Sequence, residues 1–281
     1  MKKRVSLTID SEILKKLDSR VDGVNVRNRS HIVEMMIDKQ LKAGGIKSAV
    51  ILCGGKGTRL QPITYEIPKT LIPVQGRPLI DHLFDLLKRH GIRNTVLSVG
   101  HQKEKIKKHI DDGFRFGMNV SYCEEDEPLG TAGALGLLKG SNMIPTEPFI
   151  VSNGDELKNI DIDEMFEAHK NSNALVTIAL TAVDNPSVYG VARLSGNQIL
   201  EFVEKPSPEK TPSNFINAGF YIIEPDVIDM IPDGFSMLEK DVFPKLAEMG
   251  RLHGFTFSGQ WFDTGNMERY ERALKEWKPL K

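Results

Sequence analysis

A glycine-rich turn with two nearby cations has the clearest chemistry in this sequence. Residues 54–60 have the sequence GGKGTRL and follow a short apolar run, and Lys69 comes soon afterwards. Glycine has no Cβ, so backbone N–H groups in such a turn can approach phosphate oxygens closely. Arg59 offers a planar fork of donors and Lys69 a point charge, and both suit anionic oxygens. The segment therefore predicts a binding site for a nucleoside triphosphate.

Two better-known phosphate-binding loops do not fit these residues. The P-loop requires GxxxxGK[ST], and the dinucleotide fingerprint requires a third glycine at position 60, where the chain has Leu60. If only the glycines are considered, the segment could equally be a tight turn with a purely structural role. Arg59 and Lys69 favour the phosphate site.

Further motifs follow this turn in a fixed order. They are GGKGTRLQPIT at 54–64, PKTLIP at 68–73, EPLGTAGA at 127–134, NGD at 153–155, YGV at 189–191, EKP at 204–206, NAG at 217–219 and WFDTG at 261–265. With this set, the chain resembles the sugar-phosphate nucleotidyltransferase family, the NDP-sugar pyrophosphorylases, over residues 47–276. Within the family it is most similar to the mannose-1-phosphate guanylyltransferases. The resemblance implies an enzyme that transfers a nucleoside monophosphate from an NTP, with GTP favoured, to mannose 1-phosphate or a related sugar 1-phosphate, and releases pyrophosphate.

The resemblance also implies roles for individual residues. The nucleotide would contact Leu52, Gly54, Gly55, Gly57, Thr58, Arg59, Glu125, Pro128, Gly130, Thr131 and Asn153. The sugar phosphate would contact Gly190, Glu204, Lys205 and Asn217. Asp155 and Asp263 would hold Mg²⁺, a hard cation that prefers carboxylate and phosphate oxygens. Two plainer interpretations stay open, namely Asp155 as the cap of a helix near 161–170 and Asp263 as an ordinary exposed carboxylate.

The implied reaction needs no protein nucleophile. An oxygen of the sugar phosphate is already anionic at pH 7, so the obstacle is its repulsion by the α-phosphate that it must attack. Mg²⁺, Arg59, Lys69 and Lys205 would offset this repulsion and position an in-line displacement. Arg59, Lys69 and Asp155 are thus the predicted catalytic residues.

Glu125 bears on the choice of base. In the family this position lies two residues before the glutamate of EPLGTAG, and members that use UTP or dTTP commonly have Gln there. Guanine presents adjacent N1–H and N2–H₂ donors, which an ionised carboxylate can accept together. Glu125 therefore favours GTP. The alternative is a solvated run of acids over residues 124–127.

The segments that must position these residues alternate between strand and helix patterns from Lys47 onward. Predicted strands cover 48–53, 95–99, 149–152, 175–182, 189–194 and 199–204, and predicted helices cover 79–90 and 235–249. Ser236 and Glu239 fit a capping box at the start of the second helix. The alternation predicts an α/β fold, with a mainly parallel Rossmann-like sheet, helices on both faces and a later antiparallel section.

Residues 1–45 have the pattern of a separate unit, which precedes a nucleotidyltransferase domain at 46–281. The pattern is a strand over 5–9, a helix capped by Asp10 or Ser11 and a second helix capped by Ser30, and it resembles the ribbon-helix-helix family. One strand and two short helices cannot bury a core, so we expect the unit to be stable as a homodimer, with higher oligomers left open.

The outward face of a paired ribbon would present Lys2, Arg4, Ser6 and Thr8, and such a ribbon fits the major groove of DNA. Residues 1–45 contain ten Lys or Arg and six Asp or Glu, a net charge of +4, which is modest for a DNA-binding unit. Two roles therefore stay equally open: a unit that also binds DNA and one that only dimerises the enzyme.

Composition is that of a soluble globular protein, with 40% hydrophobic and 27% charged residues in 281. The basic N-terminus lacks the apolar core of a secretory signal, and no apolar run approaches bilayer length, so a cytoplasmic location is expected. Cys53 and Cys123 form no CxxC pair, which gives no indication of a zinc site or of disulfides.

Two other functions stay open beside the guanylyltransferase. One is a uridylyl- or thymidylyltransferase that acts on glucose 1-phosphate. The other is a DNA-binding regulator whose transferase domain has become a ligand sensor, and the intact pair Asp155 and Asp263 argues against it. The residues alone leave the sugar undecided, because hydroxyl stereochemistry is distinguished by loop geometry.

Overall fold

The computed structural model describes residues 6–21, 23, 26–42 and 45–280. The chain divides into two compact units, residues 1–45 and residues 46–281. No helix among the described residues is both long enough and apolar enough to cross a membrane.

The N-terminal unit contains the two predicted helices, α1 (Ser11–Asp18) and α2 (Arg29–Lys42). The carboxylate of Asp10 caps α1 by accepting from the backbone N–H groups of residues 12 and 13. At the start of α2 the side chain of Asn28, rather than Ser30, accepts from the N–H of residue 31 at 3.0 Å. A short ion pair of 2.5 Å between Arg29 and Asp18 joins the two helices.

The strand expected over residues 5–9 is not present in its described part, Ser6–Ile9. A lone strand has no neighbour to satisfy its N–H and C=O groups, which explains why a single copy of the chain does not form it. Ser6 and Thr8 are exposed, whereas Lys2 and Arg4 lie outside the described residues.

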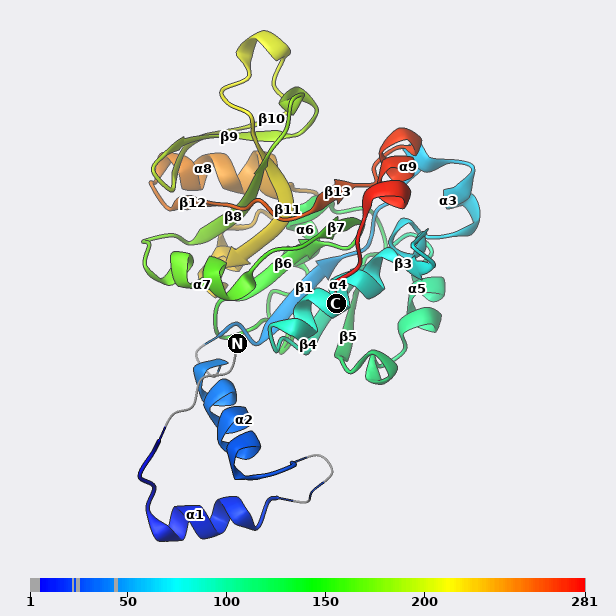
Figure 1. Ribbon diagram of the computed structural model, residues 1–281. Helices are drawn as coiled ribbons and strands as arrows, with labels where there is room; N and C mark the ends of the chain where they lie inside the picture. Colours follow the sequence, from blue (N-terminus) through cyan, green and yellow to red (C-terminus); the bar gives the residue numbers. More distant parts are fainter. Residues whose placement is uncertain (1–5, 22, 24–25, 43–44, 281) are drawn as a thin grey trace. The chain divides into compact units, whose positions relative to one another are not determined.

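A nine-stranded sheet forms the centre of the second unit, in the order β5-β4-β1-β6-β11-β8-β12-β10-β9 (Figure 1). Its strands are β1 (Ser48–Leu52), β4 (Asn94–Val99), β5 (Asn119–Glu124), β6 (Phe149–Asn153), β8 (Val176–Ala182), β9 (Gly190–Ser195), β10 (Gln198–Glu204), β11 (Phe215–Ile223) and β12 (Leu252–Thr256). Two small ribbons accompany the sheet, namely β2 (Pro73–Val74) with β3 (Arg77–Pro78), and β7 (Glu156–Lys158) with β13 (Trp261–Asp263).

The sheet is mixed, so the expectation of a mainly parallel sheet holds only for β5, β4, β1 and β6. β11 runs antiparallel to both of its neighbours, β6 and β8. β12 is parallel to β8, and β10 and β9 complete the sheet with antiparallel pairings. The sheet differs from the expected one because β11 lies between β6 and β8 and runs in the opposite direction to both.

Helices cover both faces of the sheet. The helices of this unit are α3 (Ile63–Glu66), α4 (Leu79–Arg89), α5 (Lys103–Ile110), α6 (Gly130–Gly136), α7 (Ile162–Lys170), α8 (Phe243–Glu248) and α9 (Met267–Glu276). Apolar residues of α4, α5 and α7 pack in one core with Ala49 and Ile51 of β1, while α6 and α8 pack in another with Val50. Because successive residues of a strand point to opposite faces, a run of three apolar residues in β1 supplies both cores.

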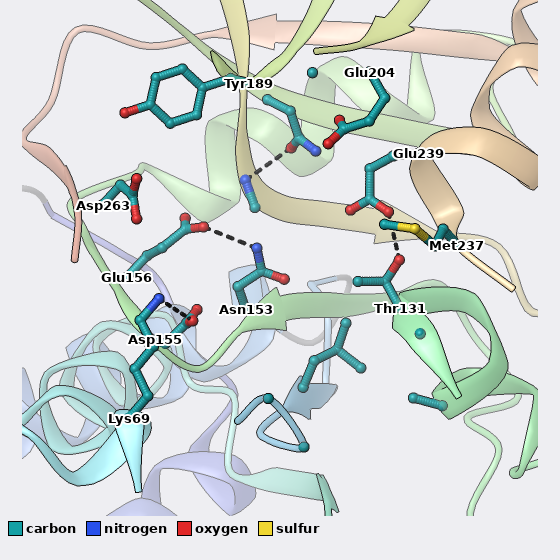
Figure 2. Close-up of a pocket in the computed structure, with 18 of the residues that line it drawn as sticks. Lys69, Thr131, Asn153, Asp155, Glu156, Tyr189, Glu204, Met237, Glu239 and Asp263 are labelled. Atoms are coloured by element: carbon teal, nitrogen blue, oxygen red, sulfur yellow. Dashed lines mark hydrogen bonds and ion pairs between the residues drawn. The ribbon is translucent and has the colours of Figure 1, made fainter. Parts of the chain in front are cut away.

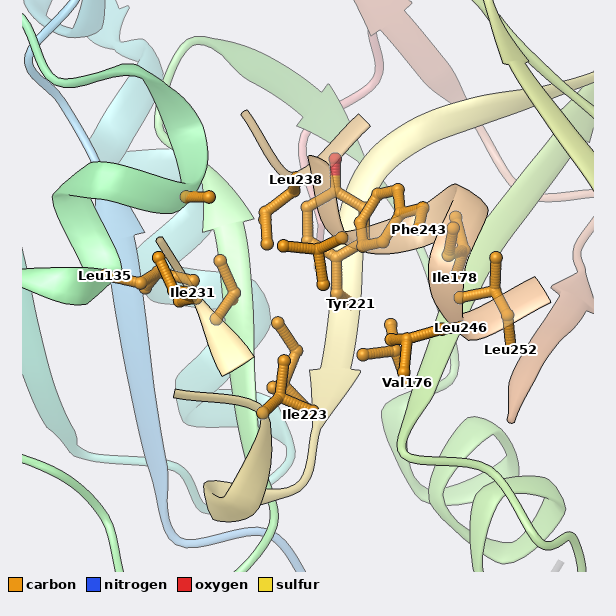
Figure 3. Packing of buried hydrophobic residues seen from close by; sticks show 14 of the residues in the cluster. Leu135, Val176, Ile178, Tyr221, Ile223, Ile231, Leu238, Phe243, Leu246 and Leu252 are labelled. Carbon is orange, nitrogen blue, oxygen red and sulfur yellow. The ribbon is translucent and has the colours of Figure 1, made fainter. Parts of the chain in front are cut away.

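The second core is built around aromatic and branched side chains (Figure 3). Tyr221 of β11 and Phe243 of α8 lie with ring centroids 5.2 Å apart, next to Leu246. A third core is formed where α9 returns to the chain that follows the glycine turn, and it contains Leu60, Ile72, Leu79 and Trp277.

The predicted capping box at Ser236 is wrong. The segment begins with a π-helical turn, Leu238–Val242, and only then continues as α8. The Asp241 carboxylate accepts from the N–H of Met237 at 2.7 Å, and the Ser236 hydroxyl lies 3.4 Å from a carbonyl oxygen of the preceding turn. Glu239, the expected partner of Ser236, instead accepts a hydrogen bond from Thr131.

Candidate active site

A cavity of about 490 Å³ opens at the carboxyl ends of β1 and β6, where the parallel strands meet the antiparallel section. Such strand ends are the usual ligand sites of α/β sheets. The cavity is lined by Leu52, Gly54, Gly55, Arg59, Lys69, Glu125, Pro128, Gly130, Thr131, Ala134, Asn153, Asp155, Glu156, Val188, Tyr189, Gly190, Glu204, Lys205, Asn217, Gly219, Phe235, Met237, Glu239, Asp263 and Arg269.

The structure thus brings the predicted nucleotide, sugar-phosphate and metal residues to one cavity, with two exceptions. Gly57 and Thr58 do not line it. Gly57 adopts a left-handed conformation with φ of +62°, and a Cβ there would lie 2.8 Å from Thr64. The glycine therefore serves the turn itself, which leads into a short 3-10 helix over Thr58–Leu60.

At one end of the cavity the Lys69 ammonium lies 2.6 Å from the Asp155 carboxylate (Figure 2). Burial acts to raise the pKa of Asp155, but the charge and hydrogen bond of Lys69 outweigh it and hold that pKa below its usual value. Asp155 does not cap α7, because Asp161 accepts from the N–H of Glu164 in that role. The carboxylate of Asp155 therefore has no capping role at that helix.

Glu156 adds a third carboxylate at this end, beside Asp155 and Asp263. It accepts from Asn153 at 2.9 Å and from the indole of Trp261 at 3.2 Å, and the ammonium of Lys158 lies 3.2 Å away. Burial is the main cause of its raised pKa, and the charges of Asp155 and Asp263 add to the increase. This end of the cavity therefore holds three carboxyl groups close together.

Asp263 is not an ordinary exposed carboxylate. It forms a very short ion pair with Arg269, whose guanidinium also lies 4.8 Å from the ring centre of Tyr189. Arg59 approaches the same corner, because a Cβ on Gly265 would meet both Asp263 and Arg59 within about 3 Å. Two arginines and an acidic cluster thus share one end of the cavity.

Glu125 lies at the nucleotide-loop end and is only 8% exposed, so it does not belong to a solvated charge run. It accepts from Ser98 at 2.9 Å and from the backbone N–H of Leu129 at 3.2 Å. A Cβ on Gly54 would lie 2.5 Å from its carboxylate, which explains the glycine at that position. The neighbouring Glu124 behaves differently, because hydrogen bonds from two lysines lower its pKa to about 2.

The loop before α6 is held by a distant segment of chain. The carbonyl of Ser236 accepts from two N–H groups in the first turn of α6, those of Ala132 and Gly133, at 3.0 and 3.1 Å. The Thr131 hydroxyl lies 2.5 Å from the Glu239 carboxylate and accepts from the N–H of Leu238. This contact fixes the loop against the cavity wall.

Several residues of the cavity were not predicted from the sequence. Tyr189 and Gly219 belong to the motifs YGV and NAG, so the motifs located them without assigning them a role. Glu156 directly follows Asp155 and had no other signal. Glu239 was assigned to a capping box, and Arg269 lies in a helix that only the tertiary fold brings to the site.

Comparison with known proteins agrees with this geometry. Residues 48–278 match the nucleotidyl transferase family. The chain belongs to this family. Among curated relatives of this chain, UTP–glucose-1-phosphate uridylyltransferase of Synechocystis sp. is 36% identical over 241 residues, which are 81% of this chain and 62% of the relative. Mannose-1-phosphate guanyltransferase beta-A of Xenopus laevis is 37% identical over 220 residues, 77% of this chain and 61% of the relative. The chain thus spans about three fifths of the length of these relatives.

Solved structures of similar proteins have the same fold as this chain. A putative glucose-1-phosphate thymidylyltransferase from Bacillus anthracis superposes with a TM-score of 0.75 at 27% identity, over 84% of this chain and 98% of the other. HddC from Yersinia pseudotuberculosis, complexed with GMP-PN, superposes with a TM-score of 0.70 at 28% identity, over 83% and 100% of the two chains.

Proposed function

We propose that this protein transfers a nucleoside monophosphate from an NTP to a sugar 1-phosphate and releases pyrophosphate. The observation that supports it best is the division of the cavity (Figure 2). Lys69 and a group of carboxylates lie on one side, whereas Glu204 lies on the other, against Gly190. Phosphates fit the first part and a sugar ring fits the second.

The residues at the acidic end fit a magnesium ion. Asp155, Glu156 and Asp263 supply carboxylate oxygens, the donors that Mg²⁺ prefers, and Asp155 and Asp263 are the ones that would hold it. When bound, the ion would neutralise negative charge on the phosphates. Lys69 and Arg269 balance these carboxylates in the present structure.

The protein's own contribution is to position two anions for in-line displacement. Arg59 binds phosphate oxygens of the triphosphate, and Lys69 stabilises the charge that develops as pyrophosphate departs. Lys205 attracts the phosphate of the sugar, and Glu204, whose carboxylate lies 2.9 Å from Lys205, accepts from sugar hydroxyls. Asn217 and the backbone at Gly190 complete the sugar pocket.

Turnover can be tested with the full-length protein, Mg²⁺ and a panel of GTP, UTP and dTTP against mannose 1-phosphate and glucose 1-phosphate. Release of pyrophosphate with at least one pair is the expected result. Absence of turnover with every pair would overturn the enzyme and favour a domain that only senses ligands.

GTP is the proposed nucleotide, and mannose 1-phosphate or a related sugar 1-phosphate the proposed acceptor. Glu125 supports the base, because a buried carboxylate at the nucleotide-loop end can accept from two adjacent donors of guanine. The carbonyls of uracil or thymine would repel it. The relatives include enzymes named for both GTP and UTP chemistry, so the glucose-1-phosphate uridylyltransferase is the second candidate.

Glu125→Gln tests this assignment. The variant should lose part of the preference for GTP over UTP or dTTP, by a factor of about 30–100, which corresponds to ~2–3 kcal/mol. Asp126→Gln, at a fully exposed neighbouring side chain, is the control. A wild-type preference for UTP or dTTP, or the same base ranking in Glu125→Gln, would contradict the proposal.

Self-association through the N-terminal unit is a separate proposal. Apolar side chains are exposed on the described part of that unit, including Leu7 at 61%, Ile13 at 54%, Met35, Met36 and Ile37. A second copy of this chain would cover such side chains and pair the segment before α1 as a ribbon.

A further inference from the structure

Glu239 is a buried acid of the cavity that the reaction proposed above does not use. Its residue is 7% exposed, and one carboxylate oxygen, Oε2, lies 2.5 Å from the hydroxyl of Thr131. That hydroxyl accepts from the N–H of Leu238, so its proton is donated to Glu239. The second oxygen, Oε1, takes no part in this bond.

The backbone around Glu239 has an unusual geometry. Glu239 lies in the π-helical turn Leu238–Val242, and π-helical turns occur frequently at functional sites. Leu238 and Val242 are buried in the apolar core, whereas Glu239 between them lines the cavity. The turn is therefore held by its two buried apolar side chains, and it directs the carboxylate of Glu239 into the cavity.

The partners of Glu239 distinguish it from the phosphate-binding end. Asp155 and Asp263 lie next to Lys69 and Arg269, so that end of the cavity can accommodate anions. Glu239 instead has a neutral hydroxyl as its partner. A carboxylate in that setting would repel a phosphate but can accept a hydrogen bond from a neutral hydroxyl group.

We propose that Glu239 determines sugar specificity by binding a ring hydroxyl of the sugar 1-phosphate, on the wall that faces Glu204. Figure 2 shows both carboxylates directed toward the same space, with Met237 beside Glu239. Burial has the largest effect on the pKa of Glu239 and raises it, and the hydrogen bond from Thr131 lowers it. Smaller effects come from the charges of Glu204, which raises this pKa, and of Lys205, which lowers it, so the charged neighbours of Glu239 are the sugar-side residues. The inference rests on the proposed function.

The test compares the full-length wild type with Glu239→Gln and Glu239→Ala. Kinetics are measured with mannose 1-phosphate and glucose 1-phosphate, which differ at one hydroxyl, and with GTP and 2′-deoxy-GTP. Glu239→Ala should raise KM for the preferred sugar about 10–100-fold, reduce the ratio of kcat/KM between the two sugars, and leave KM for GTP within about twofold. Glu239→Gln keeps an acceptor oxygen, so its KM for the sugar and its sugar preference should lie between those of the wild type and those of Glu239→Ala. Glu248→Gln, at an exposed site in α8, is the control.

Thr131→Val separates recognition from support of the loop. If this variant, which keeps the Glu239 carboxylate, reproduces the full effect on sugar KM and on sugar preference, Glu239 acts only by holding the loop and the proposal is overturned. If Glu239→Gln and Glu239→Ala change the ratio between GTP and 2′-deoxy-GTP instead, Glu239 contacts ribose and the proposal is again overturned.

Calorimetric titration with the two sugar 1-phosphates separates this inference from the proposed reaction. If the wild type releases no pyrophosphate, the proposed function fails, but binding of one sugar 1-phosphate that Glu239→Ala abolishes would still support Glu239. Equal binding by the wild type and by a folded Glu239→Ala variant would overturn it.

Discussion

Acidic side chains that are adjacent in the sequence have different environments in this cavity, and the neighbours of each one decide its chemistry. Asp155 has a lysine beside it and a lowered pKa, whereas Glu156, one residue later, is buried among other acids and has a raised pKa. Glu124 and Glu125 also differ in their surroundings, since one is paired with two partly exposed lysines and the other is buried. Sequence spacing cannot show these differences, because partners come from distant segments.

Asp155→Asn and Asp263→Asn should each reduce turnover about 100–1000-fold. The loss corresponds to ~3–4 kcal/mol of transition-state stabilisation that weakened Mg²⁺ binding would remove. Pyrophosphate release under saturating substrates measures the effect, and circular dichroism checks that each variant is folded. Asp126→Asn, on a fully exposed side chain, is the matched control. A near-wild-type rate in either variant would remove that residue from the proposed metal site.

Replacement of Glu239 by Gln should change the pH dependence of stability. Burial is the main cause of the raised pKa of Glu239, so the folded protein holds this proton more tightly than the unfolded chain. The stability that the folded protein gains by holding this proton is complete below the pKa of the unfolded chain, and it is lost as the pH rises through the raised folded pKa. Glutamine does not titrate. The free energy of unfolding of the variant, relative to the wild type, should therefore increase as the pH rises from the unfolded pKa of this carboxyl to its raised folded pKa. Urea unfolding at several pH values measures the free energy of unfolding of both proteins. A difference between them that does not change with pH would contradict the prediction.

At the scale of elements, α9 packs in the third core and reaches the acidic end of the site. Trp277, directly after α9, is 2% exposed and packs against Phe262, and its indole N–H lies 3.4 Å from His82 of α4. Tyr270 donates to the carbonyl of Pro73 at 2.7 Å. Arg269 in the same helix reaches Asp263, so the packing of α9 and the charge balance of the cavity depend on each other.

Trp277→Ala should destabilise the protein by about 3–5 kcal/mol, because a large side chain is removed from a closed core. Chemical denaturation measures the change, and the variant should also bind GTP more weakly, since Arg269 is less firmly placed. Leu274→Ala, at a partly exposed position of α9, serves as the control and should cost about 1 kcal/mol or less. Equal stability of the two variants would show that α9 does not close this core.

Elements with a clear local pattern were predictable. β1, β4 and α4 match the sequence prediction within a residue or two, because apolar periodicity and turn residues define them. The opposite direction of β11 and the π-helical turn before α8 were not predicted, since neither direction nor a one-residue change in helical turn leaves a mark on periodicity. Motif residues of the site were found, and Arg269 was missed because only tertiary packing brings it there.

At the scale of the whole molecule, a small basic unit precedes a larger one that contains the entire cavity. Every residue that lines the cavity lies between Leu52 and Arg269, within the second unit. Catalysis and self-association should therefore be separable.

Deletion of residues 1–44 should leave pyrophosphate release within about twofold of the full chain, while it lowers the mass in solution, because the exposed apolar side chains of the first unit are removed. Light scattering after gel filtration measures the mass. An unchanged mass would contradict self-association through this unit. Salt-dependent binding of the full chain, but not of the deleted one, to mixed DNA fragments would favour a DNA-binding role over simple dimerisation.

The contact between Thr131 and Glu239 joins residues 108 positions apart, and Ser236 satisfies two N–H groups in the first turn of α6 from the same distant segment. On a translating ribosome, the loop that would hold the base emerges long before the segment that holds it in place. Until then those N–H groups have water as their partner. GTP should consequently be unable to assist early folding of the nascent chain, and nucleotide-dependent protection from protease should begin only once synthesis has passed Glu239.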